Sequence, residues 1–358
     1  MNIEKNSIKD FNYGLAILRI WMCFEVVLVH FKNWSVTQGA NFSLPQRILI
    51  LYEWIAVPVF ILTSFIFTDM NKLSKDNDKI KHRLYRLLIP HFFWAFVYYA
   101  IYRILDNIKG LDLEHGIIDL YWQLLLGHSI NQTEWFQIDL IVLTLLFIVI
   151  FRFCPKSIAI KLTFCIGCLA FYFQYSGKNG AMFDKIVWPE GFQTDYVTYP
   201  VGRLCEMVPY AVLGIMLCNY CVFDLVKRYW KYIVIATLLF LSLLFNYQLF
   251  PVVERQYGYS GLRYIVIGTM SVFLFYFLPL HWLPKIIKSI IKFFAKYTMA
   301  VYFMHRLVAT ILYNSQLSFR LRLRPGSFYD CIVIYFCCVV TAWLISLIPI
   351  KLIRNSVM

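Results

Sequence analysis

The strongly apolar segment of residues 14–34 carries a cation, a carboxylate and an imidazole well inside its length, namely Arg19, Glu25 and His30. Each costs a few kcal/mol near the centre of a bilayer, so such residues usually mark a functional site. A guanidinium can bind an anion, and an imidazole can accept a proton near neutral pH. His30 follows Arg19 by eleven positions, which on a helix places both on one stripe about 16 Å apart. The stripe predicts a lined passage through a membrane. The alternative is that Arg19 snorkels to the interface and His30 lies at headgroup level.

Glu25 would point away from that stripe and therefore needs a partner on another helix. The candidates are three arginines in or at the ends of other apolar segments: Arg203, Arg263 and Arg306.

A second cationic group lies in the stretch KHRLYRLLIPHFFW, where Arg83 and Arg86 are neighbours on one helix face. Each guanidinium can bind a phosphate through two parallel hydrogen bonds, and Lys79 and Lys81 precede them. Pro90 cannot donate to the carbonyl of Arg86, so a kink is expected there. These residues predict a phosphate-binding mouth. The alternative is ordinary membrane-flanking charge in contact with lipid phosphates.

The composition indicates the environment of these residues. The chain has 358 residues, of which 60% are hydrophobic and 15% are charged, against about 45–50% and 25% in soluble domains. Apolar runs recur from end to end, so we expect a single all-α, polytopic membrane domain over residues 1–358. About ten spans are expected, near 14–34, 48–68, 86–105, 135–153, 157–175, 201–219, 230–250, 261–280, 296–314 and 329–351.

The charge distribution predicts how these spans are oriented. With a cytoplasmic N-terminus, basic residues gather in inward loops such as 69–86 and 285–296, whereas the outward loops 106–134 and 176–200 carry more acids than bases. We therefore expect a multi-pass protein of the plasma (inner) membrane with both termini in the cytoplasm. The net charge of +14 would then contact anionic lipids and not nucleic acid. Within the first outward loop, YWQLLLGH is too short to span and would be interfacial or re-entrant.

Two further polar groups stand near the C-terminus. The stretch KYTMAVYFMHRLV places Tyr302 one turn before His305. The stretch FRLRLRP, at 319–325, puts three arginines on the outer side: Arg320, Arg322 and Arg324. They could bind an anionic acceptor or a lipid headgroup, or they could belong to a plain interfacial segment. No set of histidines, cysteines and acids has metal-ligand spacing, so no catalytic metal is expected.

The order of several short motifs resembles the acyltransferase-3 family of integral membrane acyltransferases over residues 10–350. The matching pieces are Arg19-x10-His30, Arg83-x-x-Arg86, VPVFILTSFIF at 57–67, EWF at 134–136, GRLCEMVPYAVLG at 202–214 and YFMH at 302–305. The family often has Ser-Gly in the second span, whereas here Ser64 is followed by Phe65. Some members carry a fused esterase-like domain, and we expect this one to stand alone.

The resemblance implies transfer of an acyl group, most often acetyl, from cytoplasmic acyl-CoA to a hydroxyl of a surface or exported glycan or glycolipid. In that reaction His30 is the natural general base, and Arg19 or a hydroxyl could stabilise the oxyanion. Arg83, Arg86, Lys79 and Lys81 would bind the coenzyme. The candidates for substrate binding are Glu25, Ser64, Arg203, Tyr302, His305, Arg320, Arg322 and Arg324.

A different class of protein also fits the spans, namely a transporter or flippase of polysaccharide intermediates. Such a protein would use Arg19 and His30 as part of a substrate or proton path and would not need coenzyme A. A receptor or structural protein would leave the charged stripe unexplained. The sequence leaves open the acceptor, the size of the acyl group and the oligomeric state, a homodimer included.

Overall fold

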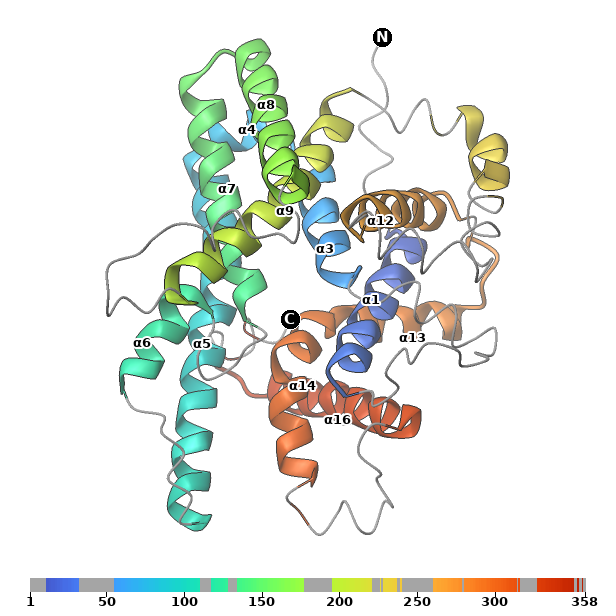
Figure 1. Ribbon diagram of the computed structural model, residues 1–358. Coiled ribbons are helices and arrows are strands. Elements are labelled where there is room, and N and C mark those ends of the chain that lie inside the picture. The colour runs from blue at the N-terminus through green and yellow to red at the C-terminus, as the bar shows by residue number, and fades with distance from the viewer. Residues whose placement is uncertain are drawn as a thin grey trace.

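The computed structural model describes residues 11–31, 55–109, 117–127, 134–176, 195–220, 226, 228–236, 239, 260–278, 280–313, 315, 327–350, 353 and 356. Every regular element within these ranges is a helix, as the all-α prediction requires (Figure 1). The helices are α1 (Tyr13–Phe31), α3 (Ala56–Ile66), α4 (Met70–Ser74), α5 (Asn77–Lys109), α6 (Ile117–Leu126), α7 (Trp135–Phe153), α8 (Lys156–Ser176), α9 (Asp195–Asn219), α12 (Ser260–Tyr276), α13 (Lys285–Lys296), α14 (Thr298–Tyr313) and α16 (Phe328–Ser346).

Among the described residues, four helices are long and apolar enough to cross a membrane: α1, α5 over Asn77–Leu105, α7 and α16. The expected count of about ten spans is therefore not confirmed. Length explains part of the difference, because α14 has 16 residues and α12 has 17. At 1.5 Å per residue these reach about 24–26 Å, short of a hydrocarbon core about 30 Å thick. Helix α9 is long enough, but it carries Arg203 and Glu206.

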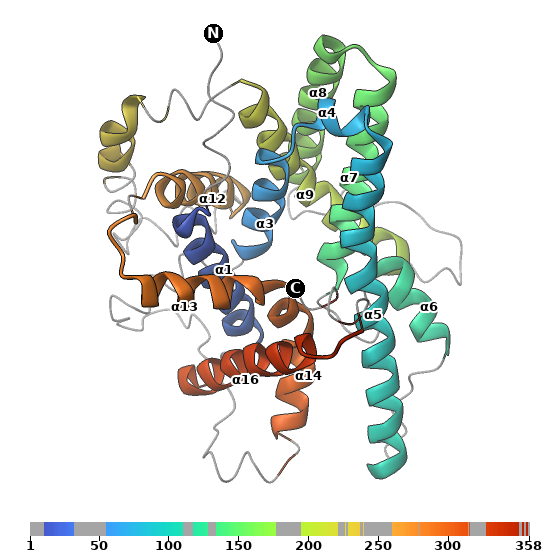
Figure 2. The same cartoon turned by 180° about the vertical axis from the view of Figure 1, so that it is seen from behind.

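Helix α1 is the centre of one half of the molecule, where it contacts α3, α12, α13, α14 and α16. Both views show the other half, in which α5, α7 and α8 lie side by side and α9 crosses them (Figures 1 and 2). Helix α3 joins the halves through contacts with α1, α9 and α12. The helix with the candidate polar stripe therefore lies inside the bundle, and its buried face includes Leu18, Met22 and Val27.

The basic segment 69–86, expected as a loop, is helical over α4 and the start of α5. The reason lies in two aspartates that satisfy free amides at the helix starts. Asp69 accepts a hydrogen bond from the amide of Lys72 at 3.1 Å, and Asp76 accepts one from the amide of Lys79 at 3.1 Å. Helix α5 then continues through Pro90 without interruption.

The segment 285–296, also expected as an inward loop, is the amphipathic helix α13. Ile291 and Ala295 are buried, and they pack with Ala16 of α1. Ile286 and Ile290 are 75% and 49% exposed. A helix with a lysine-rich face and an exposed apolar face is suited to lie in the plane of a membrane interface.

Helix α6 is too short to span, as expected for YWQLLLGH, because ten residues reach only about 15 Å. It ends at Gly127, whose positive φ of 63° suits a residue without a β-carbon. A β-carbon there would lie 2.7 Å from the backbone of Trp135. A buried hydrogen bond of 2.9 Å from Gln123 to Glu134 also ties α6 to the residue before α7. Helix α6 is thus fastened to the first turn of α7.

Candidate active site

A cavity of about 880 Å³ lies among α1, α3, α5, α7, α13 and α14. Its basic lining residues are Arg19, His82, Arg83, Arg86, Lys292 and Lys296. The described lining contains no carboxylate, so five lysine and arginine charges face one space without an acidic counterpart in that lining. Such an arrangement focuses positive potential and favours an anionic ligand.

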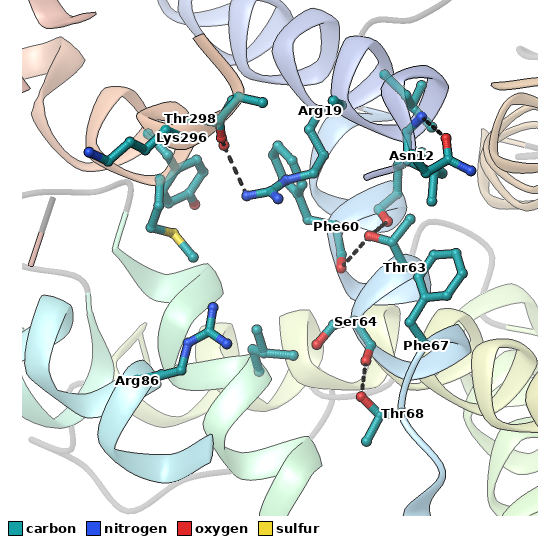
Figure 3. Close-up of a pocket in the computed structure, with 18 of the residues that line it drawn as sticks. Asn12, Arg19, Phe60, Thr63, Ser64, Phe67, Thr68, Arg86, Lys296 and Thr298 are labelled. Atoms are coloured by element: carbon teal, nitrogen blue, oxygen red, sulfur yellow. Dashed lines mark hydrogen bonds between the residues drawn. The ribbon is translucent and has the colours of Figure 1, made fainter. Parts of the chain in front are cut away.

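Two guanidiniums frame the cavity from different helices. Figure 3 shows Arg19 of α1 and Arg86 of α5 on opposite sides of the space, with Ser64 of α3 and Thr68, just beyond the end of α3, along a third side. Arg19 donates to the hydroxyl of Thr298 at 3.1 Å. Arg19, expected at the catalytic centre, therefore belongs to the cationic wall.

Arg83 and Arg86 line the same cavity but differ in their contacts. Arg83 donates to the hydroxyl of Thr68 at 2.7 Å and to that of Ser64 at 2.9 Å. Within the part of the chain that the structure describes, no hydrogen bond or ion pair engages the Arg86 guanidinium, which lies exposed in the cavity. Arg83 is thus held by the end of α3 and the residue pair that follows it, while Arg86 is available to a ligand.

The two lysines expected beside them lie outside the cavity lining. Lys79 pairs with Asp76 at 2.6 Å, and its side chain is 65% exposed. Lys81 is also exposed. Their place in the cationic wall is taken by Lys292 and Lys296 of α13, which the sequence analysis assigned only to membrane orientation. The helical spacing of lysines at 285, 288, 292 and 296 was the available signal.

A second cluster lies at the C-terminal end of α1, where two histidines meet. The rings of His30 and His305 are stacked with centroids 5.1 Å apart and an interplanar angle of 28°. Nη2 of Arg306 lies 3.2 Å from Nδ1 of His30. The structure therefore brings together two imidazoles that the sequence analysis treated separately, and it adds Arg306 to them.

Tyr302 links the cavity to the histidine cluster. It lines the cavity, and its ring centroid is 5.2 Å from that of Phe136 and 6.4 Å from that of His305. Because α14 carries both Thr298, bonded to Arg19, and Arg306, bonded to His30, it runs along α1 from one cluster to the other. The buried side chain of Tyr302 therefore lies between the cavity and the imidazoles.

The remaining candidates lie elsewhere. Arg203 donates to both carboxylate oxygens of Asp139, at 3.1 and 3.2 Å, and stacks on the Trp135 ring at 4.7 Å. Glu25 is buried, at 2% exposure. Two of the arginines proposed as partners of Glu25 contact other side chains as well. Arg203 donates to Asp139, and Arg306 contacts His30. The outer arginines Arg320, Arg322 and Arg324, and the side chain of Arg263, lie outside the described residues.

Metal ligation finds no counterpart in the described ranges. No group of three or more histidines, cysteines or acids in those ranges is placed to hold a metal ion. The polar groups that the described residues do gather are cations, hydroxyls and imidazole nitrogens, which suit an anionic organic ligand and proton transfer.

A family model described as an acyltransferase domain matches residues 12–350, nearly the whole chain. Neither the curated proteins nor the solved structures compared with the chain give a match.

Proposed function

The chain belongs to the acyltransferase-3 family, and we propose that it transfers an acyl group, acetyl in the first instance, from acyl-CoA to a hydroxyl of a surface or exported glycan or glycolipid. Family membership and the membrane-spanning helices make it a membrane acyltransferase. The donor, the acyl group and the acceptor are the proposal. The proposed reaction needs a site that binds the anionic acyl donor, a base that accepts the hydroxyl proton, and a route between the two.

The proposal rests mainly on the cationic cavity, whose described lining contains no carboxylate. Coenzyme A bears several phosphate groups on its nucleotide, and guanidiniums and ammoniums are the side chains that bind them. The volume of the cavity, about 880 Å³, falls within the range of small-molecule sites, about 300–1,000 Å³. Arg86 is free to engage a phosphate, whereas Arg83 is already oriented by the hydroxyls of Ser64 and Thr68.

The two clusters support a division between donor and acceptor sides. The cationic cavity is lined by the beginnings of α1 and α5 and by α13, all segments that the charge pattern assigns to the cytoplasm. His30 lies near the other end of α1, eleven residues or about 16 Å away. The flexible arm of coenzyme A would extend from the cavity past Tyr302 toward the imidazoles, where the acceptor hydroxyl arrives from outside.

The chemistry then requires a proton acceptor and a hydrogen-bond donor. The hydroxyl oxygen of the acceptor forms a bond to the thioester carbon while the carbon–sulfur bond breaks, and the hydroxyl proton passes to an imidazole. Donors directed at the carbonyl oxygen stabilise its developing negative charge. The remaining parts of the proposal are a single membrane domain over residues 1–358, in the plasma (inner) membrane, with both termini cytoplasmic.

The test compares surface glycans from cells with and without the gene by mass spectrometry. We expect an acetyl or succinyl mass difference that returns with the wild-type gene but not with His30→Ala produced at the same level. His281→Ala, which changes an exposed histidine outside both clusters, should restore the difference. Purified protein that neither binds nor hydrolyses acetyl-CoA would contradict the proposal and favour a transporter of polysaccharide intermediates.

A further inference from the structure

The contact between Arg306 and His30 determines which ring nitrogen of His30 carries the proton. An arginine side chain has only donors, so the 3.2 Å contact makes Nδ1 of His30 the acceptor. A neutral imidazole with an accepting Nδ1 carries its single proton on Nε2. The other nitrogen of His30 is therefore a hydrogen-bond donor.

His305 has the opposite arrangement. Its Nδ1 lies 2.8 Å from the carbonyl oxygen of Tyr302 and 3.2 Å from that of Val301. Carbonyl oxygens can only accept, so Nδ1 of His305 must carry the proton and Nε2 must present a lone pair. That Nε2 atom is buried and has no hydrogen-bond partner within the described residues, and the side chain is 0% exposed.

An unpaired buried acceptor is costly, and native proteins rarely keep one without a reason. Here the unpaired nitrogen belongs to an imidazole stacked on His30, with ring centroids 5.1 Å apart. The pair therefore presents one donor nitrogen and one acceptor nitrogen within a single cluster. An incoming hydroxyl would supply the donor that Nε2 of His305 lacks.

Resting on the proposed acyl transfer, we propose that His305 is the general base and that His30 donates its Nε2 hydrogen to the thioester carbonyl oxygen. The hydroxyl oxygen attacks the carbonyl carbon and its proton moves to Nε2 of His305. The carbon–sulfur bond breaks, and the proton passes from His305 to the leaving thiolate, which regenerates the neutral imidazole. Ester and free coenzyme A are the products. The sequence analysis favoured His30 as the general base, whereas this assignment gives that role to His305 and makes His30 the hydrogen-bond donor.

The proton positions can be measured directly by nitrogen-15 NMR of histidine-labelled wild-type protein in nanodiscs at a pH where both rings are neutral. Nitrogen shifts and long-range couplings distinguish the two tautomers, and His30→Gln and His305→Gln assign the signals. We expect the proton of His30 on Nε2 and that of His305 on Nδ1. The reverse tautomer at either ring would overturn the inference, whatever the activity of the protein.

Variants test the roles through donor hydrolysis and acyl transfer by purified protein. In His305→Asn the side-chain amide can replace the N–H group that Nδ1 directs at the backbone carbonyls, but the variant has no base. We expect a loss of about 10²–10⁴-fold in turnover with unchanged affinity for the acyl donor. His30→Ala should lose about 10²–10³-fold, and His30→Gln, which retains an N–H donor, should recover at least about tenfold of it. His281→Gln is the matched control.

The outcomes separate the two proposals. A wild-type protein that binds no acyl-CoA and transfers no acyl group contradicts the proposed function itself. An active wild type whose His305→Asn variant keeps full turnover contradicts the role of His305 alone. If His305→Asn does not fold, His305→Gln with normal donor affinity replaces it. Failure of His30→Gln to exceed His30→Ala would return the base to His30.

Discussion

At the scale of single residues, two arginines three positions apart have different tasks. Arg83 makes hydrogen bonds of 2.7 and 2.9 Å to the hydroxyls of Thr68 and Ser64, so part of its bonding capacity holds α5 against α3. Arg86 lines the same cavity with its guanidinium exposed. A bound phosphate would be the hydrogen-bond partner of Arg86 in the cavity, whereas Arg83 would share its donors between the phosphate and the two hydroxyls.

We therefore predict that Arg86→Ala weakens acyl-CoA binding more cleanly than Arg83→Ala. Loss of a charge-assisted contact costs about 1.5–3 kcal/mol, roughly ten- to hundredfold in affinity. Lysine should restore little, since it lacks the planar fork. Calorimetry with a non-hydrolysable acyl-CoA measures the effect. Arg103→Ala, an exposed arginine farther along α5 and outside the cavity lining, should bind normally. Equal affinity in Arg86→Ala and Arg103→Ala would exclude Arg86 from the donor site.

Arg83 should instead affect stability as well as binding. Arg83→Ala removes the donor for the hydroxyls of Ser64 in α3 and of Thr68 in the segment after it, and each hydrogen bond to a charged group contributes about 1.5–3 kcal/mol. We expect a lower unfolding temperature in detergent together with weaker donor binding. Ser64→Ala removes one hydroxyl only and should show a smaller decrease. A variant as stable as wild type would show that these bonds do not hold the helices.

The sequence was informative about which residues are polar and much less about what they contact. Arg83 and Arg86 were placed together correctly, because helical spacing alone makes them neighbours. The contact of His30 with Arg306 joins residues 276 positions apart, and no local pattern encodes such a pairing. Lys79 lies outside the cavity lining and pairs with Asp76, an interaction that a charge count does not reveal.

At the scale of elements, predicted boundaries were good wherever an apolar run had polar ends. The span predicted at 135–153 coincides with α7, which follows Glu134 and stops before Cys154 and Pro155. Helix α13 was missed as a helix because four lysines interrupt its apolar residues, and a search for continuous hydrophobic runs passes over that pattern. The spacing of the lysines in α13 is that of an amphipathic helix. Ile291 and Ala295 pack with Ala16 of α1, whereas Lys292 and Lys296 line the cavity.

Helix α13 supplies a testable part of the donor site. Lys292 and Lys296 line the cavity, while Lys285 lies on the same helix outside the lining. An exposed ion pair contributes about 0.2–1 kcal/mol, so Lys292→Ala with Lys296→Ala should weaken donor binding about two- to tenfold and reduce its dependence on salt. Lys285→Ala is the control. If Lys285→Ala were to weaken binding as much as the double variant, α13 would act through general surface charge.

The packing of α3 on α9 depends on a close approach at Gly214. A β-carbon there would lie 2.8 Å from the carbonyl oxygen of Leu62 and 2.9 Å from Cβ of Phe65. Gly214→Ala must push the helices apart, which typically costs about 1–3 kcal/mol. Gly202→Ala, on the same helix with no atom within 4 Å, should leave stability unchanged or raise it. Thermal unfolding followed by size-exclusion chromatography measures both, and similar midpoints for the two variants would contradict the close contact.

At the scale of the whole molecule, fold class was easier to predict than the number of membrane crossings. Composition and long apolar runs were enough for an all-α membrane protein, and four helices within the described ranges meet the requirements of a span. Helices such as α12 and α14 are shorter than a bilayer core. Hydropathy along a sequence registers apolar runs but not where a helix ends, and the run expected to span at 230–250 lies largely outside the described residues. The count of ten therefore stays a prediction.

We predict that the cationic cavity faces the cytoplasmic side of the membrane. Its lining combines the beginnings of α1 and α5 with α13, and these are the lysine- and arginine-rich segments that the positive-inside pattern retains in the cytoplasm. In a cysteine-free background, which requires replacing ten native cysteines, Lys75→Cys should react with a membrane-impermeant maleimide only after cells are permeabilised. Lys185→Cys, in the acidic segment 176–200, should react in intact cells. Acyl-CoA cannot cross the bilayer, so inverted vesicles should consume added donor and right-side-out vesicles should not. If both cysteines reacted from outside, the cavity could not receive a cytoplasmic donor, and the route from Arg86 past Tyr302 to the histidines would have to run in another direction.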